Sequence, residues 1–427
     1  MGTLRVMRLS LDDPVLVGRI ASDGAMFTYD SSYLENPEAT PLSLSLPLSG
    51  EAYSEKRFRP YFEGLLAEGT ARRVLAGELQ LPEEDYLALL AACGKDCVGD
   101  VVIECEDDEE QKGESGYEPV SLEELRSVFH DVPRIAEANI AARLSLAGAQ
   151  SKIGLAHDSR MPIGDGWLHA HGRCATTHIL KASHVRDVPE LEFLCMQAAS
   201  ACGIAVARTA LLDLGTPVLA VERFDRRVSD AGALLRVERL HQEDLAQAFG
   251  IVSGSKYAEL PGGSVSSIAR LIRVRSVRPA YDIAEFAKTM LFAYLVGDCD
   301  RHLKNISIFP HRSRRNGDTL LSLAPAYDLV CTTRFPNLSR DLAMGLGGVR
   351  SIDDVAPEAL CAFAREIGLA PSALQALARP LAEHAASAIS AAGRGEYGPV
   401  PESTPYVADD LVDDLQPRLE VLKRFCL

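Results

Sequence analysis

The chain has 427 residues, and 44 Lys and Arg stand against 60 Asp and Glu, which gives a formal net charge of -16 at pH 7. Hydrophobic residues make up 47% of the sequence, enough to build the cores of two or three domains, so a disordered chain is excluded. The acidic balance also argues against a dedicated polynucleotide binder, because most of such a surface repels phosphate backbones.

The cysteines and the hydropathy pattern point to a protein of a reducing compartment. The ten cysteines form no C-x-x-C pair and show no paired Cys/His spacing of a structural zinc site. The N-terminus lacks the apolar core of a signal peptide, and no run approaches the roughly 18 uncharged apolar residues of a membrane span. We therefore expect a cytoplasmic protein with no membrane association.

The first hundred residues predict a small mixed subdomain. Short β-prone runs lie at 4–10 and 14–20, separated by turn-forming residues. Helical periodicity follows at 61–77 and 83–94, and each of these runs ends on a glycine suited to a helix C-terminus. The acidic stretch 104–116 has little to bury and predicts a solvated linker, so the first domain is placed at 1–112.

The next segment, 113–240, predicts a sheet-rich domain. After a short helical run at 122–130, strand-like patterns at 143–158, 166–170 and 177–183 predict a small antiparallel sheet. An amphipathic helix is expected at 188–203, followed by strands at 208–215 and 217–225.

From 241 to 427 helices dominate. The run 281–298 places seven apolar residues on one face, which predicts a helix with a broad buried side that ends at Gly297. Taken together, the elements predict an α+β chain with a β-rich N-terminal half, an added N-terminal subdomain and an all-helical C-terminal lobe.

The segment 297–309 carries the clearest chemical pattern. Asp300 and Asn305 lie five positions apart between a buried helix and an apolar run. Phosphoryl transfer needs a carboxylate that accepts the proton of the attacking hydroxyl and a nearby amide oxygen that binds Mg²⁺. Asp328 follows a β-prone run at 320–324, so a hairpin would return it beside Asn305 as a second Mg²⁺ ligand.

Two further residues of this loop have open roles. Lys304 is either a solvated charge or a cation that reaches the γ-phosphate and stabilises the transition state. His302 is expected to fix the loop beside the nucleotide rather than to act as general base, because Asp300 takes that place.

Lys181 lies in an apolar strand, where an ammonium group needs a negative partner. The candidates are nucleotide phosphates and Glu192 of the following helix, since a strand Lys paired with a helix Glu is the arrangement found in protein kinases. The plain structural alternatives are a Lys that extends to solvent and a Glu favoured by the helix N-terminus.

Two more segments complete the pattern. The small-residue loop 144–152 is suited to laying backbone N–H groups over phosphates, through Ala147, Gly148, Ala149, Gln150 and Lys152. The strand end 219–225 would form the hinge between two lobes, where Glu222 and Phe224 offer backbone groups to an adenine. These features follow one another in the chain order of a bilobal kinase: small-residue loop, strand Lys, helix Glu, hinge, D-x-x-x-x-N motif and metal-binding Asp.

These residues resemble the HipA toxins, Ser/Thr kinases of bacterial type II toxin–antitoxin modules. The similarity is carried by SLAGAQSK (145–152), THILK (177–181), AVERFDRR (220–227), QEDLAQAFG (242–250), GDCDRHLKN (297–305), YDL (327–329) and LAMGL (342–346). YFEGLLAEG and GKDCVGDVV resemble the N-terminal subdomain of that family, so the match spans nearly the whole chain.

The resemblance implies a bilobal, protein-kinase-like fold and a role for each motif. Asp300 is implied as catalytic base, Asn305 and Asp328 as Mg²⁺ ligands, Lys181 as the contact to the ATP phosphates, and Glu222 and Phe224 as adenine-hinge residues. Ser145 matches the serine whose autophosphorylation inactivates family members. Ser151 departs from the family, which commonly has an acidic residue there, and this puts the local pairing of Lys152 in doubt.

The resemblance also implies partners: a HipB-type helix-turn-helix antitoxin dimer, operator DNA contacted mainly through that antitoxin, and a protein substrate such as an aminoacyl-tRNA synthetase, whose phosphorylation arrests growth. Two other functions stay open from the residues. One is a small-molecule phosphotransferase of the aminoglycoside-kinase type, which shares the D-x-x-x-x-N pattern; the other is a catalytically idle scaffold for antitoxin and DNA.

Overall fold

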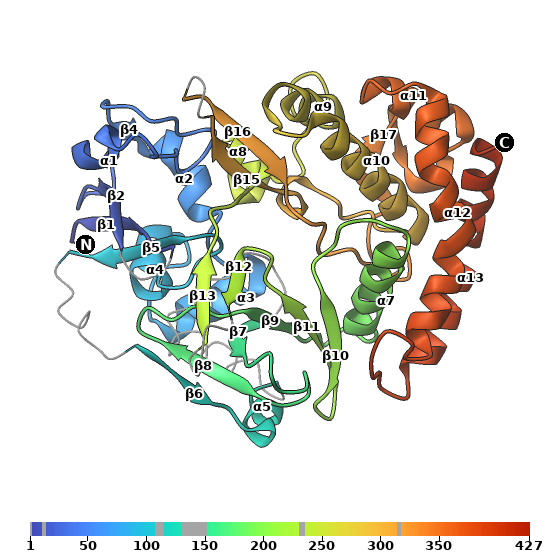
Figure 1. Ribbon diagram of the computed structural model, residues 1–427, viewed down its shortest axis with the longest axis horizontal. Coiled ribbons are helices and arrows are strands. Elements are labelled where there is room, and N and C mark those ends of the chain that lie inside the picture. The colour runs from blue at the N-terminus through green and yellow to red at the C-terminus, as the bar shows by residue number, and fades with distance from the viewer. Residues whose placement is uncertain (1, 11–13, 107–114, 130–151, 230–234, 314–316) are drawn as a thin grey trace. The chain divides into compact units, whose positions relative to one another are not determined.

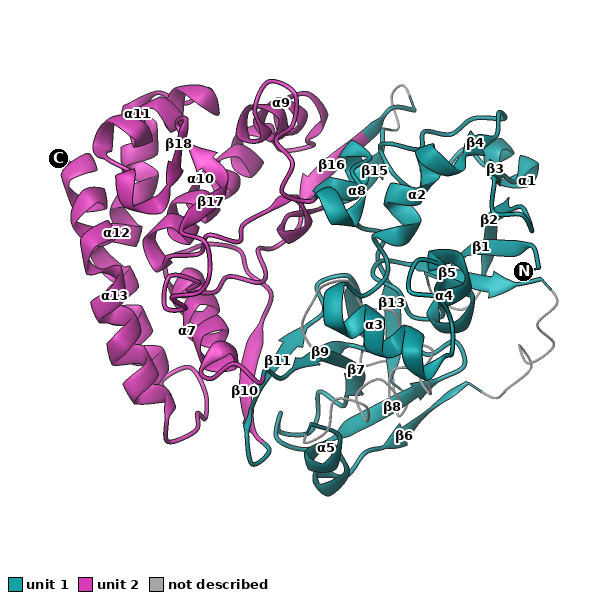
Figure 2. Cartoon of the chain, turned by 180° about the vertical axis from the view of Figure 1, so that it is seen from behind, with its two compact units in different colours: residues 1–183, 214–255, 309–319 teal, residues 184–213, 256–308, 320–427 magenta. Residues whose placement is uncertain are grey.

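The computed structural model describes residues 2–10, 14–106, 115–129, 152–229, 235–313 and 317–427 (Figure 1). The chain forms two compact units, each built from segments far apart in the sequence. Unit 1 comprises Met1–Ser183, Leu214–Ser255 and Phe309–Thr319, and unit 2 comprises His184–Asp213, Lys256–Ile308 and Leu320–Leu427 (Figure 2).

Unit 1 opens with β1 (Leu4–Arg8), β2 (Val15–Ile20), β3 (Met26–Tyr29), α1 (Ser31–Glu35), β4 (Tyr53–Ser54), α2 (Glu55–Glu63), α3 (Gly69–Glu78), α4 (Tyr86–Cys93) and β5 (Val101–Cys105). It continues with β6 (Gly116–Pro119), α5 (Leu122–Phe129), β7 (Lys152–His157), β8 (Trp167–His171), β9 (His178–Lys181), β11 (Pro217–Glu222), β12 (Arg226–Ser229), β13 (Arg236–Arg239), β14 (Glu243–Asp244) and α8 (Leu245–Phe249).

Unit 2 contains α7 (Val188–Ala201), β10 (Thr209–Asp213), α9 (Ser264–Arg275), α10 (Pro279–Val296), β17 (Asp341–Leu346), β18 (Val349–Ser351), α11 (Pro357–Glu366), α12 (Pro371–Gly393) and α13 (Thr404–Phe425). The strands β15 (Ser307–Arg312) and β16 (Thr319–Leu323) each run along the chain from one unit into the other. The prediction of an all-helical C-terminal lobe is therefore wrong in this respect, because strands β14 to β18 lie within 241–427.

Two antiparallel arrays organise unit 1. The first has the order β4-β3-β2-β1-β5, and its core is aromatic: the ring of Phe27 contacts those of Tyr29, Phe58 and Phe62 at centroid distances of 5.0, 6.4 and 5.6 Å. The second contains β11-β9-β7-β8-β6 in that order, so β9, which carries Lys181, is paired on both sides. The predicted antiparallel sheet of the middle segment is therefore present.

The predicted helix at 61–77 is wrong in its extent. Two helices cover this region, because α2 begins earlier, at Glu55, and ends at Glu63, and α3 begins only at Gly69. Gly69 has φ of +55°, in the left-handed region, which a continuous right-handed helix cannot contain.

Helix α10 is the buried centre of unit 2. The face predicted from the sequence, from Ile283 to Leu295, is buried, and α9, α12, α13 and α7 pack against this helix. Gly297 caps α10 with φ of +80°, and a Cβ at this position would lie 2.2 Å from Oγ1 of Thr333. Only glycine therefore fits where the helix passes into the loop that holds Asp300.

Within the described ranges, no helix has both the length and the apolar character needed to cross a bilayer.

Candidate active site

Asp300 lies in the loop after α10, and its side chain is 45% exposed. Its backbone N–H donates to Oδ1 of Asp298 at 2.9 Å, and its own Oδ1 accepts a hydrogen bond of 2.6 Å from the hydroxyl of Tyr257. Desolvation raises the pKa of the Asp300 carboxyl, and the hydrogen bond from Tyr257 opposes that effect. The side chain is thus a solvent-accessible carboxylate with one oxygen already held.

Asn305 closes the same loop from its other end. Its amide Nδ2 donates to the backbone carbonyl of Asp300 at 2.9 Å, and the residue is only 7% exposed. This bond employs the nitrogen of the amide, which leaves the oxygen as the atom suited to a cation.

Arg301 joins this loop to the segment of Asp328. Its guanidinium donates to the backbone carbonyls of Asn305 at 2.6 Å, Tyr327 at 2.9 Å and Asp328 at 2.9 Å. It also lies 3.3 Å from Oδ2 of the buried Asp298, whose pKa is raised to about 7 by desolvation despite that cation. The backbone carbonyls of Asn305 and Asp328, the two predicted metal ligands, therefore both accept hydrogen bonds from the guanidinium group of Arg301.

Asp328 has a left-handed backbone with φ of +57°, a conformation that costs a non-glycine residue energy and that Asp tolerates better than most. Its neighbour Tyr327 donates its hydroxyl to the backbone carbonyl of Lys304 at 2.6 Å and lies 2.8 Å from Oγ of Ser307. The hydroxyl of Tyr327 thus binds both the loop, at Lys304, and the start of β15, at Ser307, which helps to fix the unusual turn.

The structure consequently brings Asp300, Asn305 and Asp328 into one group, with Lys304 buried in the same loop. His302 is buried as well, and its Nε2 lies 3.9 Å from Oδ2 of Asp300.

The oxygen donors of this group suit magnesium. No cluster of three or more His, Cys, Asp or Glu side chains that could hold a metal occurs in the part of the chain that the structure describes. Mg²⁺ does not need one, because it keeps several waters and usually takes one or two carboxylates from the protein. An amide oxygen and a carboxylate on segments fixed by Arg301 meet that requirement.

Lys181 is placed opposite another lysine. In the pairing of β7 with β9, Lys152 and Lys181 are direct partners, so both side chains lie on the same face of the array. The contact of Lys181 and Lys152 with nucleotide phosphates stays a prediction. Ser145, Ala147, Gly148, Ala149 and Gln150 lie outside the described residues.

The predicted hinge follows β11 and is anchored by a buried charge network. Glu222 is the last residue of β11, and the N–H of Arg223 donates to the backbone carbonyl of Thr177 at 2.9 Å. The guanidinium of Arg223 binds both carboxylate oxygens of Asp225, at 3.0 and 2.9 Å. Phe224, between them, contacts the ring of Phe309 edge-on at 5.9 Å.

Glu192 is almost fully buried in α7, within unit 2, and Lys181 belongs to unit 1. Their pairing, predicted from the sequence, stays a prediction.

Three residues that shape this group were not predicted from the sequence: Tyr257, Arg301 and Tyr327. Arg301 carried a usable signal, because an arginine inside a loop that is flanked by apolar segments needs several acceptors. Tyr257 carried none, since 43 positions separate it from Asp300.

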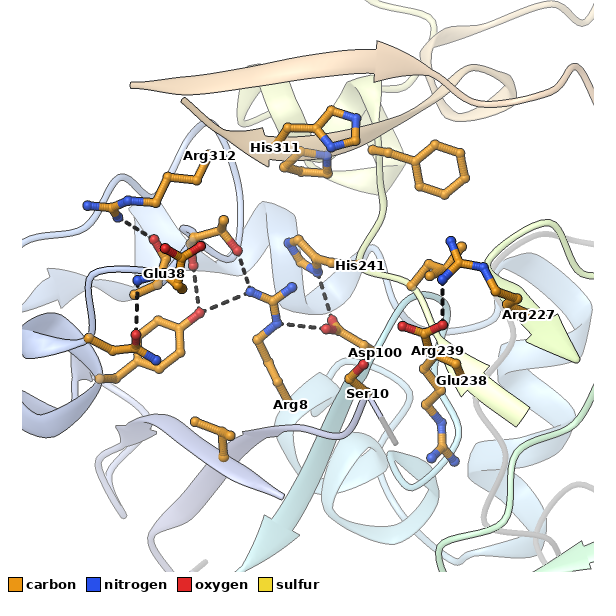
Figure 3. A pocket seen from close by; sticks show the side chains of 18 residues that line it. Arg8, Ser10, Glu38, Asp100, Arg227, Glu238, Arg239, His241, His311 and Arg312 are labelled. Atoms are coloured by element: carbon orange, nitrogen blue, oxygen red, sulfur yellow. Dashed lines mark hydrogen bonds and ion pairs between the residues drawn. The ribbon is translucent and has the colours of Figure 1, made fainter. Parts of the chain in front are cut away.

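Unit 1 also holds a polar cavity of about 920 Å³ that no motif predicted (Figure 3). Arg8 lines it and donates to Oδ2 of Asp100 at 2.7 Å and to the hydroxyl of Tyr33 at 3.0 Å. Nδ1 of His241 lies 2.9 Å from the other oxygen of Asp100. Although desolvation opposes it, Arg8 holds the pKa of Asp100 well below its usual range. These contacts join β1 and the start of β5 to the segment after β13.

Comparison with known proteins gives two family matches. A model described as the HipA N-terminal domain matches residues 11–104, and one described as the HipA-like C-terminal domain matches 144–389. Two proteins of Sinorhizobium fredii, Y4mE and Y4dM, which are provisionally named as kinases, are similar to this chain. Y4mE is 34% identical over 86% of this chain and 87% of its own length, and Y4dM is 30% identical over 75% of this chain and 75% of its own length.

Among solved structures, HipA of Shewanella oneidensis, in a complex with HipB and its operator DNA, superposes with a TM-score of 0.81 over 99% of both chains at 24% identity. At that identity the match concerns the fold, and it confirms the predicted α+β, HipA-like architecture.

Proposed function

Since the chain belongs to the HipA family, we propose that it is the toxin of a type II toxin–antitoxin module, acting as an ATP-dependent protein Ser/Thr kinase. The observation that carries the proposal is the group in which Arg301 binds the backbones of Asn305 and Asp328 next to the accessible carboxylate of Asp300. A proton acceptor beside two oxygen ligands is what phosphoryl transfer requires.

In this proposal, Asp300 accepts the proton of the attacking serine or threonine hydroxyl. Asn305 and Asp328 hold Mg²⁺, which when bound neutralises charge on the ATP phosphates. Lys304 is assigned to stabilising the charge of the transferred group rather than to a solvated position, because it is 7% exposed.

ATP itself is assigned to residues of unit 1. Lys181 and Lys152 bind phosphates, and the backbone of Glu222 and Phe224 binds adenine. The buried contacts of Arg223 and Asp225 support this role, because they hold the polypeptide on both sides of Phe224 in one conformation. His302 contributes by fixing the catalytic loop, and Glu192 orients Lys181.

Autophosphorylation at Ser145 would switch the enzyme off. A phosphate adds a charge of about -1.5 to -2, which cannot be accommodated beside the phosphates of ATP in the same loop. The proposed partners are a HipB-type antitoxin and, through it, operator DNA; the Shewanella complex, which contains HipB and operator DNA, supports this assignment. The proposed substrate is an aminoacyl-tRNA synthetase.

The test is incubation of the purified chain with radiolabelled ATP and Mg²⁺, followed by peptide mapping. We expect label on Ser145 in the wild type and none in Asp300→Asn, which keeps the size of the side chain and removes its basicity. Asp353→Asn, a change at an exposed ion pair of unit 2, is the matched control and should label normally.

Equal labelling of Asp300→Asn and the wild type would refute the base assignment. Phosphate transfer to small amino alcohols with no labelled protein would instead favour a small-molecule phosphotransferase.

A further inference from the structure

Tyr257 makes a contact with the proposed base that the proposed mechanism leaves unexplained. Its hydroxyl donates to Oδ1 of Asp300 at 2.6 Å, although the tyrosine itself is 52% exposed. Hydrogen bonds from a neutral hydroxyl to a carboxylate are short and about twice as strong as neutral ones. An exposed tyrosine that binds the reacting carboxylate is therefore more than a surface residue.

The ring of Tyr257 is held from two sides. It contacts the imidazole of the buried His302 edge-on, with centroids 5.1 Å apart, and the ammonium of Lys256 lies 5.4 Å from its centroid. Both contacts involve the ring and neither needs the hydroxyl. The position of Oη is thus set by the ring, and the hydroxyl is presented to Asp300 from a fixed place.

The carboxylate of Asp300 needs such a constraint. Its side chain is 45% exposed, and the second oxygen, Oδ2, lies 3.9 Å from Nε2 of His302, beyond a hydrogen bond. Among the contacts described for the carboxyl group of Asp300, no other side-chain hydrogen bond is as short as the one from Tyr257. Without that bond, the terminal torsion of the carboxyl group could take a broad range of angles. With Tyr257 bound to Oδ1, Oδ2 is the oxygen kept for an incoming hydroxyl.

We propose that Tyr257 is a positioning residue for phosphoryl transfer: its hydroxyl fixes the rotamer of Asp300 so that Oδ2 faces the acceptor hydroxyl of the substrate. This inference rests on the proposed function, because it assigns Asp300 the role of base. Positioning a reacting group within a few tenths of an ångström before the reaction is a large part of what enzymes contribute to rate.

The test compares Tyr257→Phe with the wild type in steady-state kinase assays. This change removes only Oη and keeps the ring contacts with His302 and Lys256. We expect kcat to fall about 10- to 100-fold, because a general base supplies roughly 10²- to 10⁴-fold and loses part of that when misaligned. The KM for ATP should stay within about twofold, since Tyr257 has no assigned contact with the nucleotide.

Tyr281→Phe is the matched control. Tyr281 is 47% exposed, lies in the same unit and contacts Arg278 through its ring. Its kcat and KM should equal those of the wild type.

A double-mutant cycle separates positioning from a general structural effect. If Tyr257 acts through Asp300, Tyr257→Phe should not lower the residual turnover of Asp300→Asn further. A fall by the same factor in both backgrounds would overturn the inference, as would an unchanged kcat in the single variant. Phosphate found on Tyr257 would overturn it too, because the hydroxyl would then be an acceptor. Full activity of Asp300→Asn would instead remove the proposed function itself.

Discussion

The buried charge network around the predicted hinge segment implies that one substitution in it causes a large and specific loss of stability. Oδ1 of Asp96 accepts from Arg226 at 2.8 Å and from Arg239 at 3.4 Å, and its Oδ2 accepts from the hydroxyl of Thr176 at 2.6 Å. Together with Asp225 it balances Arg223, Arg226 and Arg239, whose side chains are 1 to 2% exposed. We expect Asp96→Asn to destabilise unit 1 strongly.

The magnitude follows from the charges. Three buried guanidinium groups face two carboxylates in the wild type, and Asp96→Asn leaves them facing one. Removing one partner of a buried ion pair costs about 3–5 kcal/mol, because the remaining charge is left desolvated. At roughly 2–4 °C per kcal/mol for a unit of this size, Tm should fall by roughly 6–20 °C.

The assay is thermal unfolding followed by tryptophan fluorescence. Trp167 is the single tryptophan of the chain, and it is 1% exposed in β8 of unit 1, so its emission reports the unfolding of that unit. Glu238→Gln is the matched control: it breaks the pair of Glu238 with Arg227 on the same strands, β12 and β13, but at the surface. This pair is worth at most about 1 kcal/mol. Equal effects of Asp96→Asn and Glu238→Gln would refute the reasoning.

Two further predictions concern one residue in each unit. Desolvation raises the pKa of the buried Glu243 from 4.5 to about 8 although Ser43 donates to it, so the folded chain keeps a proton that the unfolded chain releases between these values. The stability contributed at this position is therefore lost as pH rises from 4.5 to 8. In urea titrations, the free energy of unfolding of Glu243→Gln should equal that of the wild type near pH 4.5 and should exceed it by up to about 1.4 kcal/mol more for each pH unit between 4.5 and 8. A difference that does not depend on pH would contradict this prediction. Arg301→Lys should lower kcat more than about 10-fold, because one ammonium group cannot reach the carbonyls of Asn305, Tyr327 and Asp328 together. As a control, Arg340→Lys, which changes the exposed ion pair of Arg340 with Asp353, should leave kcat unchanged.

The elements that the sequence predicted well are those set by local patterns. Helix α10 and its buried face follow from apolar spacing within 18 residues, and its end follows from Gly297, which only glycine can occupy. The positions of Asp300 and Asn305 between α10 and β15, and of Asp328 shortly after β16, likewise predicted that the three residues lie near the ends of neighbouring elements. For these residues, proximity in sequence becomes proximity in space through one loop and one hairpin.

The rest depends on contacts between distant segments, which composition and periodicity do not encode. The bond from Tyr257 to Asp300 spans 43 positions, and that from Arg226 to Asp96 spans 130. The interruption of the helix predicted at 61–77 was also missed, because a glycine permits either a helical or a left-handed backbone and tertiary packing selects between them. The domain limits at 112 and 240 and the role of Ser145 stay predictions.

The same network explains why the two family matches meet in one folded unit. Asp96 and the carbonyl of Cys97 lie in the region matched as the N-terminal domain, whereas Arg223, Arg226 and Arg239 lie in the region matched as the C-terminal domain. Without the N-terminal region, Arg239 would lose its described ion pair with Asp96, and Arg223 and Arg226 would keep their pairs with Asp225 but lose those with Asp96. The segment that includes Phe224 is therefore held in part by residues of the N-terminal domain, so the adenine contact proposed for this segment depends on both matched regions.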